Sequence, residues 1–210
     1  MLEQEKKVIL TPVEYDALLN RMNTISVALQ NNYYFDTENY SMNLKGITCR
    51  IREKDGIYKA IIKMHIDMED SSIEIGLESR DHLDQQVFID KGLSLQGTLK
   101  TIRTVIFKNE YIEAVLDRNV YLDTEDHELE IEYFGDNEQY ANDFLIYVAE
   151  LLLSQNVIER VEEFIMRGDR CKSKSERFFD RKIKIQKGGD LNGLNFRRNQ
   201  KNKRRGSDNY

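Results

Sequence analysis

Charged side chains recur at alternate positions in several segments of this sequence, and most of these segments carry mainly one sign. Carboxylates dominate the first and last segments, at Glu3, Glu5, Asp117, Glu128, Glu130 and Glu132. Basic side chains dominate the middle segments, at Arg50, Arg52, Lys63 and Arg103. Clustered carboxylates bind Mg2+ or Mn2+, whereas guanidinium and ammonium groups bind phosphate oxygens. If the fold brings both kinds of cluster together, they predict a site for a compact polyanion with divalent cations.

The segments that carry these charges have the alternating pattern of half-buried strands. Eight such segments cover residues 2–10, 32–37, 46–54, 57–65, 72–80, 98–108, 111–122 and 126–134. The short turns Lys54-Asp55-Gly56 and Lys108-Asn109-Glu110 join neighbouring strands, so we expect hairpins and an antiparallel sheet. Because side chains two residues apart share a face of a strand, each strand has one charged face and one apolar face.

Helix signals lie on both sides of the strand-rich part. Thr11-Pro12-Val13-Glu14 is a capping box with proline at the first helical position, and apolar residues continue at helical spacing as far as Leu29. We expect a second helix over residues 136–152, a third over 157–166 and a last short turn over 173–179. Residues 81–91 fit either a helix or a loop. The amphipathic helices are expected to cover the apolar faces of the strands.

With helices outside, the charged faces point inward if the sheet closes. We therefore predict an α+β fold, in which an eight-stranded antiparallel barrel has helices packed on its outside. Such a barrel is wide enough for one small ligand. A charged face on one strand is usually solvated, but charges sorted by sign over seven strands favour a ligand site. Burying these charges is unfavourable unless they are paired, hydrated or neutralised by ligand and metal.

The net charge of −6 over 210 residues hides two unlike parts. Residues 181–210 hold ten Lys or Arg against two Asp, and we expect a disordered basic tail there. This tail is either a solubilising extension or a weak arm for nucleic acid or an acidic surface. Residues 1–180 carry −14, which taken alone argues against a polyanionic ligand. The strand pattern outweighs that argument, because the charge that faces a ligand need not follow the total.

Several classes of protein are excluded or disfavoured. The most apolar run, Phe144 to Leu153, is too short to span a bilayer and contains Glu150. The sequence has no P-loop and no nucleophile elbow. Two distant cysteines fit neither a disulfide framework nor a zinc site, so we predict a cytoplasmic protein. We interpret Cys49 as a small buried hydrophobe, and His65, His82 and His127 as surface or packing residues.

The order of the motifs resembles a known family. Glu3-Gln4-Glu5-Lys6-Lys7 fits the ExExK signature that opens CYTH domains, the triphosphate tunnel metalloenzymes. Residues 32–37 resemble the second strand of these domains, 49–56 their RxRekdG hairpin and 61–63 their strand lysine. Residues 128–133 are similar to the late acidic strand, and 172–177 to the closing SKxxR segment. The resemblance spans residues 1–180 and is greatest to the small single-domain bacterial members.

The resemblance implies a tunnel that binds a triphosphate and hydrolyses or rearranges it with the help of two Mg2+ or Mn2+ ions. The implied metal ligands are Glu3, Glu5, Asp117, Glu128, Glu130 and Glu132. The implied phosphate-binding residues are Lys7, Arg50, Arg52, Lys63, Arg103 and Lys174, and Glu5, Lys7 and Arg52 are the expected catalytic residues. Two departures stand out: three late glutamates replace the usual two, and Met64-His65 follow Lys63 where a small residue or proline is usual.

These observations lead to one main hypothesis and three alternatives. The main one is metal-assisted attack of water on the terminal phosphoryl group of a triphosphate, inorganic or organic. The first alternative is an adenylyl cyclase of class IV type that makes cyclic AMP from ATP. The second is thiamine triphosphate or another organic triphosphate as the substrate. The third is a non-catalytic module that binds polyphosphate or nucleotide. No membrane is expected as a partner, and the sequence indicates no oligomeric state.

Overall fold

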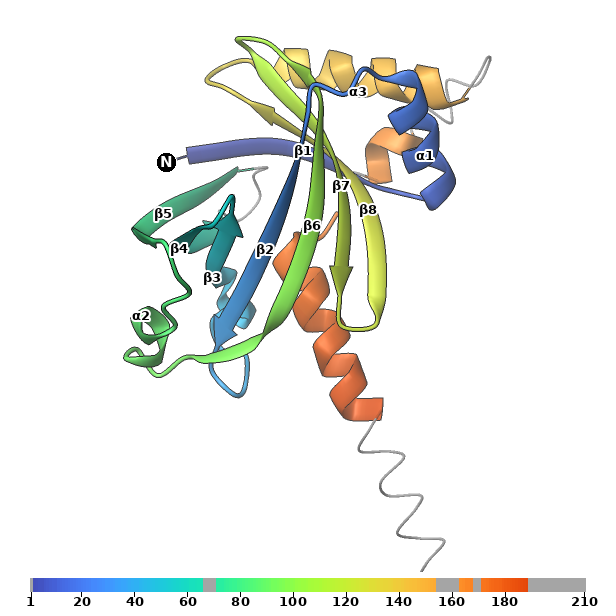
Figure 1. Cartoon of the computed structure of the whole chain (residues 1–210). Coiled ribbons are helices and arrows are strands. Elements are labelled where there is room, and N and C mark those ends of the chain that lie inside the picture. The colour runs from blue at the N-terminus through green and yellow to red at the C-terminus, as the bar shows by residue number, and fades with distance from the viewer. Residues whose placement is uncertain (1, 66–70, 154–162, 168–170, 189–210) are drawn as a thin grey trace, which may run out of the picture.

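The chain forms a closed barrel of eight antiparallel strands (Figure 1), which confirms the predicted fold class. The computed structural model describes residues 2–65, 71–153, 163–167 and 171–188, and for residues 2, 3, 71 and 153 it describes the backbone alone. The strands are β1 (Leu2–Leu10), β2 (Ser26–Asp36), β3 (Ile47–Lys54), β4 (Ile57–His65), β5 (Ser71–Arg80), β6 (Ser94–Lys108), β7 (Ile112–Tyr121) and β8 (Thr124–Tyr133). Their order around the barrel is β1-β5-β4-β3-β2-β6-β7-β8.

The first strand closes the barrel by pairing with a different strand on each of its two sides. β1 pairs with β8 over seven residue pairs, from Gln4 and Tyr133 to Leu10 and His127. On its other side it pairs with β5 over three residue pairs, among them Glu3 with Ser72. The contact between β1 and β5 is therefore the shortest pairing of the barrel, and we call it the seam.

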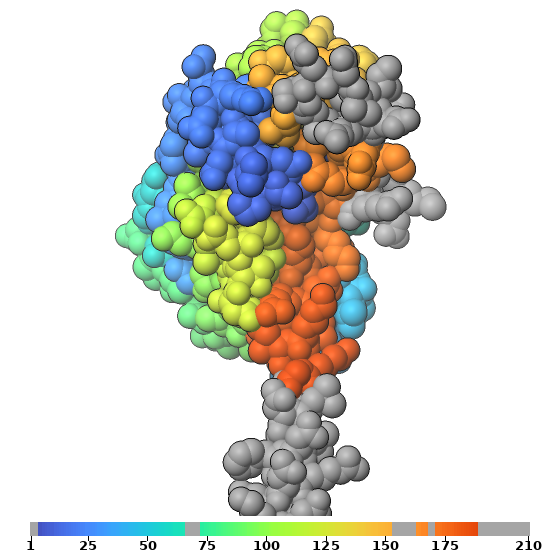
Figure 2. Space-filling view, turned by 90° about the vertical axis from the view of Figure 1, so that its right-hand side faces the viewer, coloured from blue at the N-terminus to red at the C-terminus, as the bar shows by residue number. Residues whose placement is uncertain are grey.

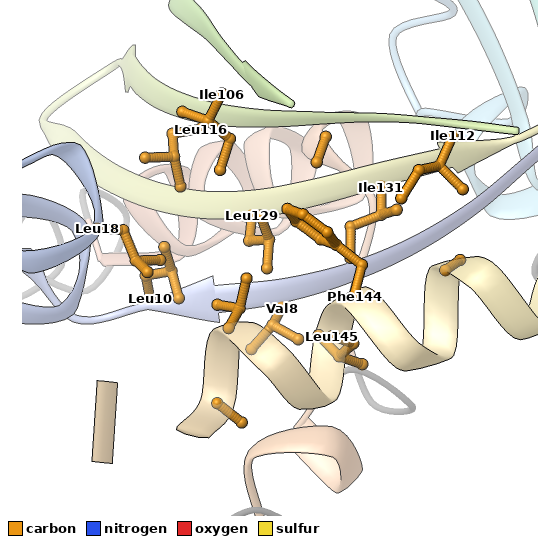
Figure 3. Packing of buried hydrophobic residues seen from close by; sticks show 14 of the residues in the cluster. Val8, Leu10, Leu18, Ile106, Ile112, Leu116, Leu129, Ile131, Phe144 and Leu145 are labelled. Carbon is orange, nitrogen blue, oxygen red and sulfur yellow. The ribbon is translucent and has the colours of Figure 1, made fainter. Parts of the chain in front are cut away.

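Two helices cover one side of the barrel. α1 (Pro12–Arg21) begins with the predicted capping box, in which the Thr11 hydroxyl accepts a hydrogen bond from the Glu14 backbone N–H. α3 (Glu138–Leu153) lies near α1, and both pack on the outer faces of β1, β7 and β8 (Figures 1 and 3). The shared core includes Val8, Leu10, Leu18, Leu116, Leu129, Ile131, Phe144 and Leu145. This cover is the one predicted from helical spacing.

The first helix is shorter, and the second strand longer, than the sequence predicts. The helix ends at Arg21, and β2 begins at Ser26 instead of residue 32. Ile25 donates its backbone N–H to the Val105 carbonyl, and β2 pairs with β6 along its whole length. Pairing with a long neighbouring strand therefore overrides the helical spacing of Ile25 and Leu29.

The other side of the barrel has less cover. Residues 81–91 contain one helical turn, α2 (Gln86–Ile89), and its Phe88 packs on Phe35 and the buried Cys49. On β5 the outward side chains of Ile73, Ile75 and Leu77 are 40%, 43% and 41% exposed. The expectation that helices cover every apolar face is thus wrong for β5 in the described structure.

A helix over residues 174–188 closes one end of the barrel. It is longer than the expected turn at 173–179, and it includes the first eight residues of the expected tail. Phe178 packs inside the barrel against Tyr34, with 5.0 Å between ring centroids, and against Tyr121. Figure 2 shows this helix, in orange and red, beside the yellow-green strands β7 and β8. One end of the interior is therefore filled by aromatic rings.

Other expected elements lie partly outside the described residues. Of the expected helix at 157–166, residues 163–166 lie in a helical segment over 163–167, and the rest is not described. Residues 189–210 of the expected tail also lie outside the description. A short 3-10 turn, η1 (Asn43–Lys45), precedes β3. No helix in the described ranges is long and apolar enough to cross a membrane.

The contact between the last helix and the barrel leads to a stability prediction. A Cβ added at Gly97 would lie 2.8 Å from Phe178 Cζ, and the backbone φ of +149° disfavours a side chain there. We expect Gly97→Ala to destabilise the protein by about 1–3 kcal/mol, as overpacking does. Urea denaturation would measure this. Gly188→Ala is the control, since a Cβ there meets nothing within 4 Å. Equal stability of both variants would contradict the packing of Phe178 on Gly97.

Candidate functional site

The interior of the barrel next to the aromatic end is a polar cavity. Its volume is about 620 Å3 when the space that is open to solvent is included. Nine of the residues predicted for the site line it: Glu5, Lys7, Arg50, Arg52, Lys63, Arg103, Glu130, Glu132 and Lys174. The cavity therefore brings together acids and bases that lie up to 169 positions apart in the chain, from Glu5 to Lys174.

Strand register places acids opposite bases. Lys7 of β1 lies opposite Glu130 of β8, and Arg103 of β6 lies opposite Asp117 of β7. Asp117 in turn lies opposite Glu128. Because directly paired residues of antiparallel strands point to the same face, all of these side chains point inward.

Arg103 holds two of the acids. It binds both oxygens of Asp117, at 2.7 Å from Nη2 and 3.0 Å from Nε, and Glu130 at 2.6 Å. Burial opposes the charge of Arg103, but the carboxylates outweigh it and raise the pKa of the guanidinium. Arg103 therefore acts as a fixed counter-ion to the acidic side of the cavity.

Three buried carboxylates form a candidate metal site. Oxygens of Asp117, Glu128 and Glu130 all lie within 4.8 Å of one another. The Lys174 ammonium lies among them, 3.0 Å from Asp117 and 2.6 Å from Glu130, and it also contacts Glu128. The contact with Glu128 is made to Oε1, and Arg177 binds Oε2 of the same carboxylate. Three buried oxygen donors around one cation suit a hard divalent ion.

A further acid lies on β1, where Glu5 is directly paired with Glu132 of the neighbouring strand β8. Glu5 contacts Lys7 at 2.5 Å and Lys63 at 3.4 Å. Burial favours the neutral acid, but the charge of Lys7, joined by Lys63, outweighs burial and lowers the pKa of Glu5 to about 2. Glu5 is therefore ionised at neutral pH and available to a cation.

Arg52 is the cation that lacks an acid. Its side chain donates from Nε to Asn32 Oδ1 at 3.3 Å, and no carboxylate within the described ranges forms an ion pair with it. Its neighbour Arg50 is paired with Glu74 at 2.9 Å. Burial, together with the charges of Arg50 and Arg103, lowers the pKa of Arg52 to about 10. A half-buried guanidinium that has other guanidinium groups nearby and no ion pair of its own favours an anion in the cavity.

Two predicted residues lie at the limits of the site. Glu132 lines the cavity but its side chain is 38% exposed, and it is 3.6 Å from Arg103. Glu3 lies on β1 opposite Ser72, while its side chain is outside the described residues.

The structure adds residues that sequence reasoning missed. Arg177, one helical turn after Lys174, binds Asp126 at 2.9 Å and Glu128 at 2.6 Å. Asn32 accepts a hydrogen bond from Arg52, and the alternation of side chains along β2 could have predicted that Asn32 points inward. His65 also lines the cavity, a position that its interpretation as a surface or packing residue did not indicate. The sequence signal for this position was its spacing, because a residue two positions after Lys63 on the same strand shares the inward face of Lys63.

The comparisons with known proteins agree with this geometry. A model of the CYTH domain matches residues 1–160. This chain belongs to the CYTH family. No curated protein matches the chain.

Solved structures show the same fold as this CYTH protein. A candidate adenylate cyclase from Bacillus halodurans is 23% identical with a TM-score of 0.61, and the match covers 84% of this chain and 97% of that one. A candidate adenylyl cyclase from Hippeastrum with a dominant triphosphatase activity is 17% identical, with a TM-score of 0.57 and coverage of 77% and 95%. A protein from Pyrococcus horikoshii is 14% identical, with a TM-score of 0.59 and coverage of 85% and 99%.

The carboxylate cluster leads to a second prediction. Lys174→Met removes the ammonium that neutralises three buried carboxylates, so we expect a loss of about 3–5 kcal/mol in stability without divalent metal. Urea denaturation in EDTA would measure it. Lys172→Met is the control, because its ion pair with Asp180 is exposed and such pairs contribute about 0–1 kcal/mol. Equal losses in the two variants would contradict the buried role of Lys174.

Glu5 leads to a prediction about pH. Its pKa is lowered in the folded protein, so its contribution to stability is complete above the unfolded pKa near 4.5 and is lost as the pH falls towards 2. We expect the stability of Glu5→Gln to fall less steeply than that of the wild type between pH 4.5 and pH 2. Denaturation curves across this range would test it, and parallel curves would refute the ion pairs of Glu5.

Proposed function

We propose that this CYTH protein hydrolyses a triphosphate with the help of divalent metal ions. The observation that carries the proposal is Arg52, a half-buried guanidinium without an ion-pair partner among the described residues, in a cavity that is also lined by Glu130 of the buried carboxylate cluster. The first feature suits phosphate oxygens, and the second suits Mg2+ or Mn2+. The Hippeastrum neighbour, with its dominant triphosphatase activity, supports the same reaction.

The basic residues would bind and orient the substrate. Arg52, Arg50 and Lys63 follow the inward faces of β3 and β4, and Lys7 lies on β1. Guanidinium and ammonium groups held in a water-poor cavity stabilise charge on phosphoryl oxygens, and positioning is most of the catalysis in phosphoryl transfer. The ion pair of Arg50 with Glu74 fixes its guanidinium before substrate binds.

The carboxylates would hold the metal. Asp117, Glu128 and Glu130 would bind one divalent cation, and Glu5, with Glu3 and Glu132, a second. When bound, such ions supply charge neutralisation and a coordinated water of lowered pKa. Arg103 and Arg177 form ion pairs with the first cluster and orient its carboxylates. Lys174 also lines the cavity, so an ammonium displaced from the cluster would face the substrate.

A cyclase remains a second candidate, because two structural neighbours are candidate adenylate cyclases. A cyclase must bind adenine as well as phosphate, and buried bases commonly stack on aromatic side chains. Among the described residues, the cavity is lined by charged and polar side chains, and His65 is the one residue with a ring. This lining favours a compact triphosphate and hydrolysis.

Activity would test the proposal. With Mg2+ or Mn2+, the protein should release phosphate from inorganic tripolyphosphate, and Arg52→Ala and Glu5→Gln should each lower kcat/KM by about 10²–10³-fold. Arg118→Gln is the control, because Arg118 forms an exposed ion pair with Glu125. With ATP, phosphate and cyclic AMP should be measured together, and thiamine triphosphate tested beside them.

Different outcomes would separate the candidates. Cyclic AMP as the main product from ATP would favour the cyclase. Tight binding of tripolyphosphate by calorimetry, without turnover under any divalent metal, would favour a binding module. Full activity in both variants would refute the assignment of the site.

A further inference from the structure

Two polar side chains without partners lie together where the cavity approaches the seam. His65 Nε2 and Ser72 Oγ are buried, and neither has a hydrogen-bond partner within the described ranges. The two residues are directly paired in the register of β4 and β5, so their side chains share a face. His65 lines the cavity, and Ser72 is 2% exposed.

Such groups are uncommon in folded proteins. Most buried polar side-chain atoms have a partner, and leaving one unpaired lowers the stability of the fold. Two unpaired groups that share one face of neighbouring strands, one of them on a residue that lines the cavity, are explained most simply if a ligand completes their hydrogen bonds.

The surroundings identify the chemistry of that ligand. His65 follows Lys63 on the same face of β4, and its Cα is about 7 Å farther along at 3.3 Å per residue. Lys63 lies opposite Thr48 of β3, whose hydroxyl is 2.7 Å from that of Ser175. Arg50 and Arg52 continue the inward face of β3 from Thr48. The basic face that begins at Arg52 therefore ends at His65.

The ring is suited to donate one hydrogen bond. Burial, aided by the charge of Lys63, lowers the pKa of His65, so the imidazole is neutral at pH 7. A neutral imidazole has one N–H, and Nε2 is the ring nitrogen that is buried without a hydrogen-bond partner among the described residues. A serine hydroxyl donates as well.

We propose that His65 Nε2–H and the Ser72 hydroxyl donate hydrogen bonds to the phosphoryl group at one end of the bound triphosphate. The inference rests on the proposed function and adds to it a contact that recognises the end of the phosphate chain. His65 is then a substrate-binding residue that the resemblance to the family did not indicate.

The competing role for His65 is that of a general base, which would accept a proton at Nε2. Two substitutions distinguish the roles by geometry and chemistry. The side-chain amide of glutamine places an N–H near the position of Nε2, whereas that of asparagine lies near Nδ1. Glutamine can donate a hydrogen bond but cannot accept a proton as a base at neutral pH.

The experiment compares four variants with the wild type: His65→Gln, His65→Asn, His65→Ala and Ser72→Ala. Binding of inorganic tripolyphosphate would be measured by calorimetry in EDTA, and its hydrolysis with Mg2+ or Mn2+. We expect His65→Ala and His65→Asn to weaken binding roughly 10- to 100-fold, as loss of a hydrogen bond to a charged group does. We expect His65→Gln to stay within about threefold of the wild type, and Ser72→Ala to lose several-fold. His82→Gln is the control, since His82 is exposed.

A spectroscopic measurement can distinguish direct contact with the phosphate from a purely structural role of His65. In protein labelled with 15N histidine, addition of tripolyphosphate should shift the Nε2 resonance of His65, identified by its loss in His65→Gln. The resonances of His82 should stay unchanged.

The outcomes separate this inference from the proposed function. If the wild type neither binds nor hydrolyses any triphosphate, the proposed function fails and the inference fails with it. If the wild type is active and His65→Ala binds equally well, the inference alone is overturned. If His65→Gln binds normally but loses turnover as fully as His65→Ala, His65 is a base and the proposed contact is wrong.

Discussion

The structure depends on one constraint: a barrel whose interior is charged folds only if nearly every charge has a partner of opposite sign. Isolated charges are strongly disfavoured in a water-poor interior, and paired ones are tolerated. The carboxylates of β7 and β8 meet Arg103, Lys174 and Arg177, and Glu5 of β1 meets Lys7. The network leaves Arg52 with an amide oxygen and no described acid. Site and stability are therefore parts of the same electrostatic arrangement, and the exception to the pairing marks where an anion fits.

The sequence predicted the barrel and its inward faces because alternation along a strand is a local property. The faces that carry Glu5, Arg52 and Glu130 follow directly from a period of two. By the same rule Tyr33 and Tyr34 lie on opposite faces, and in the structure Tyr34 is buried beside Phe178 whereas Tyr33 packs on Tyr58. Cys49 is buried on the apolar side as predicted, and burial raises its pKa to about 11.

What sequence could not supply is information about distant partners. Leu29 fits a helical spacing as well as a strand, and only the length of β6 decides between them. Lys174 was expected to bind phosphate, but whether it meets phosphate or carboxylate depends on how the last helix docks. Arg177 and His65 were missed for the same reason, since their roles arise from neighbours on other elements. Local pattern thus fixes which residues face inward, and tertiary contacts fix what each one touches.

The position of Lys174 and Phe178 near the end of the described chain has a consequence for biosynthesis. All eight strands leave the ribosome before these residues do. Until then Asp117 and Glu130 have Arg103 as a countercharge but lack Lys174, and Glu128 lacks both Lys174 and Arg177. Tyr34 also faces an interior without its neighbour Phe178. The barrel of a nascent chain is therefore electrostatically incomplete. The contacts of Lys174, which lie 44 or more positions away along the chain, must form last. A chain cut off before residue 174 would keep every strand and lose the charge balance that holds the acidic strands together.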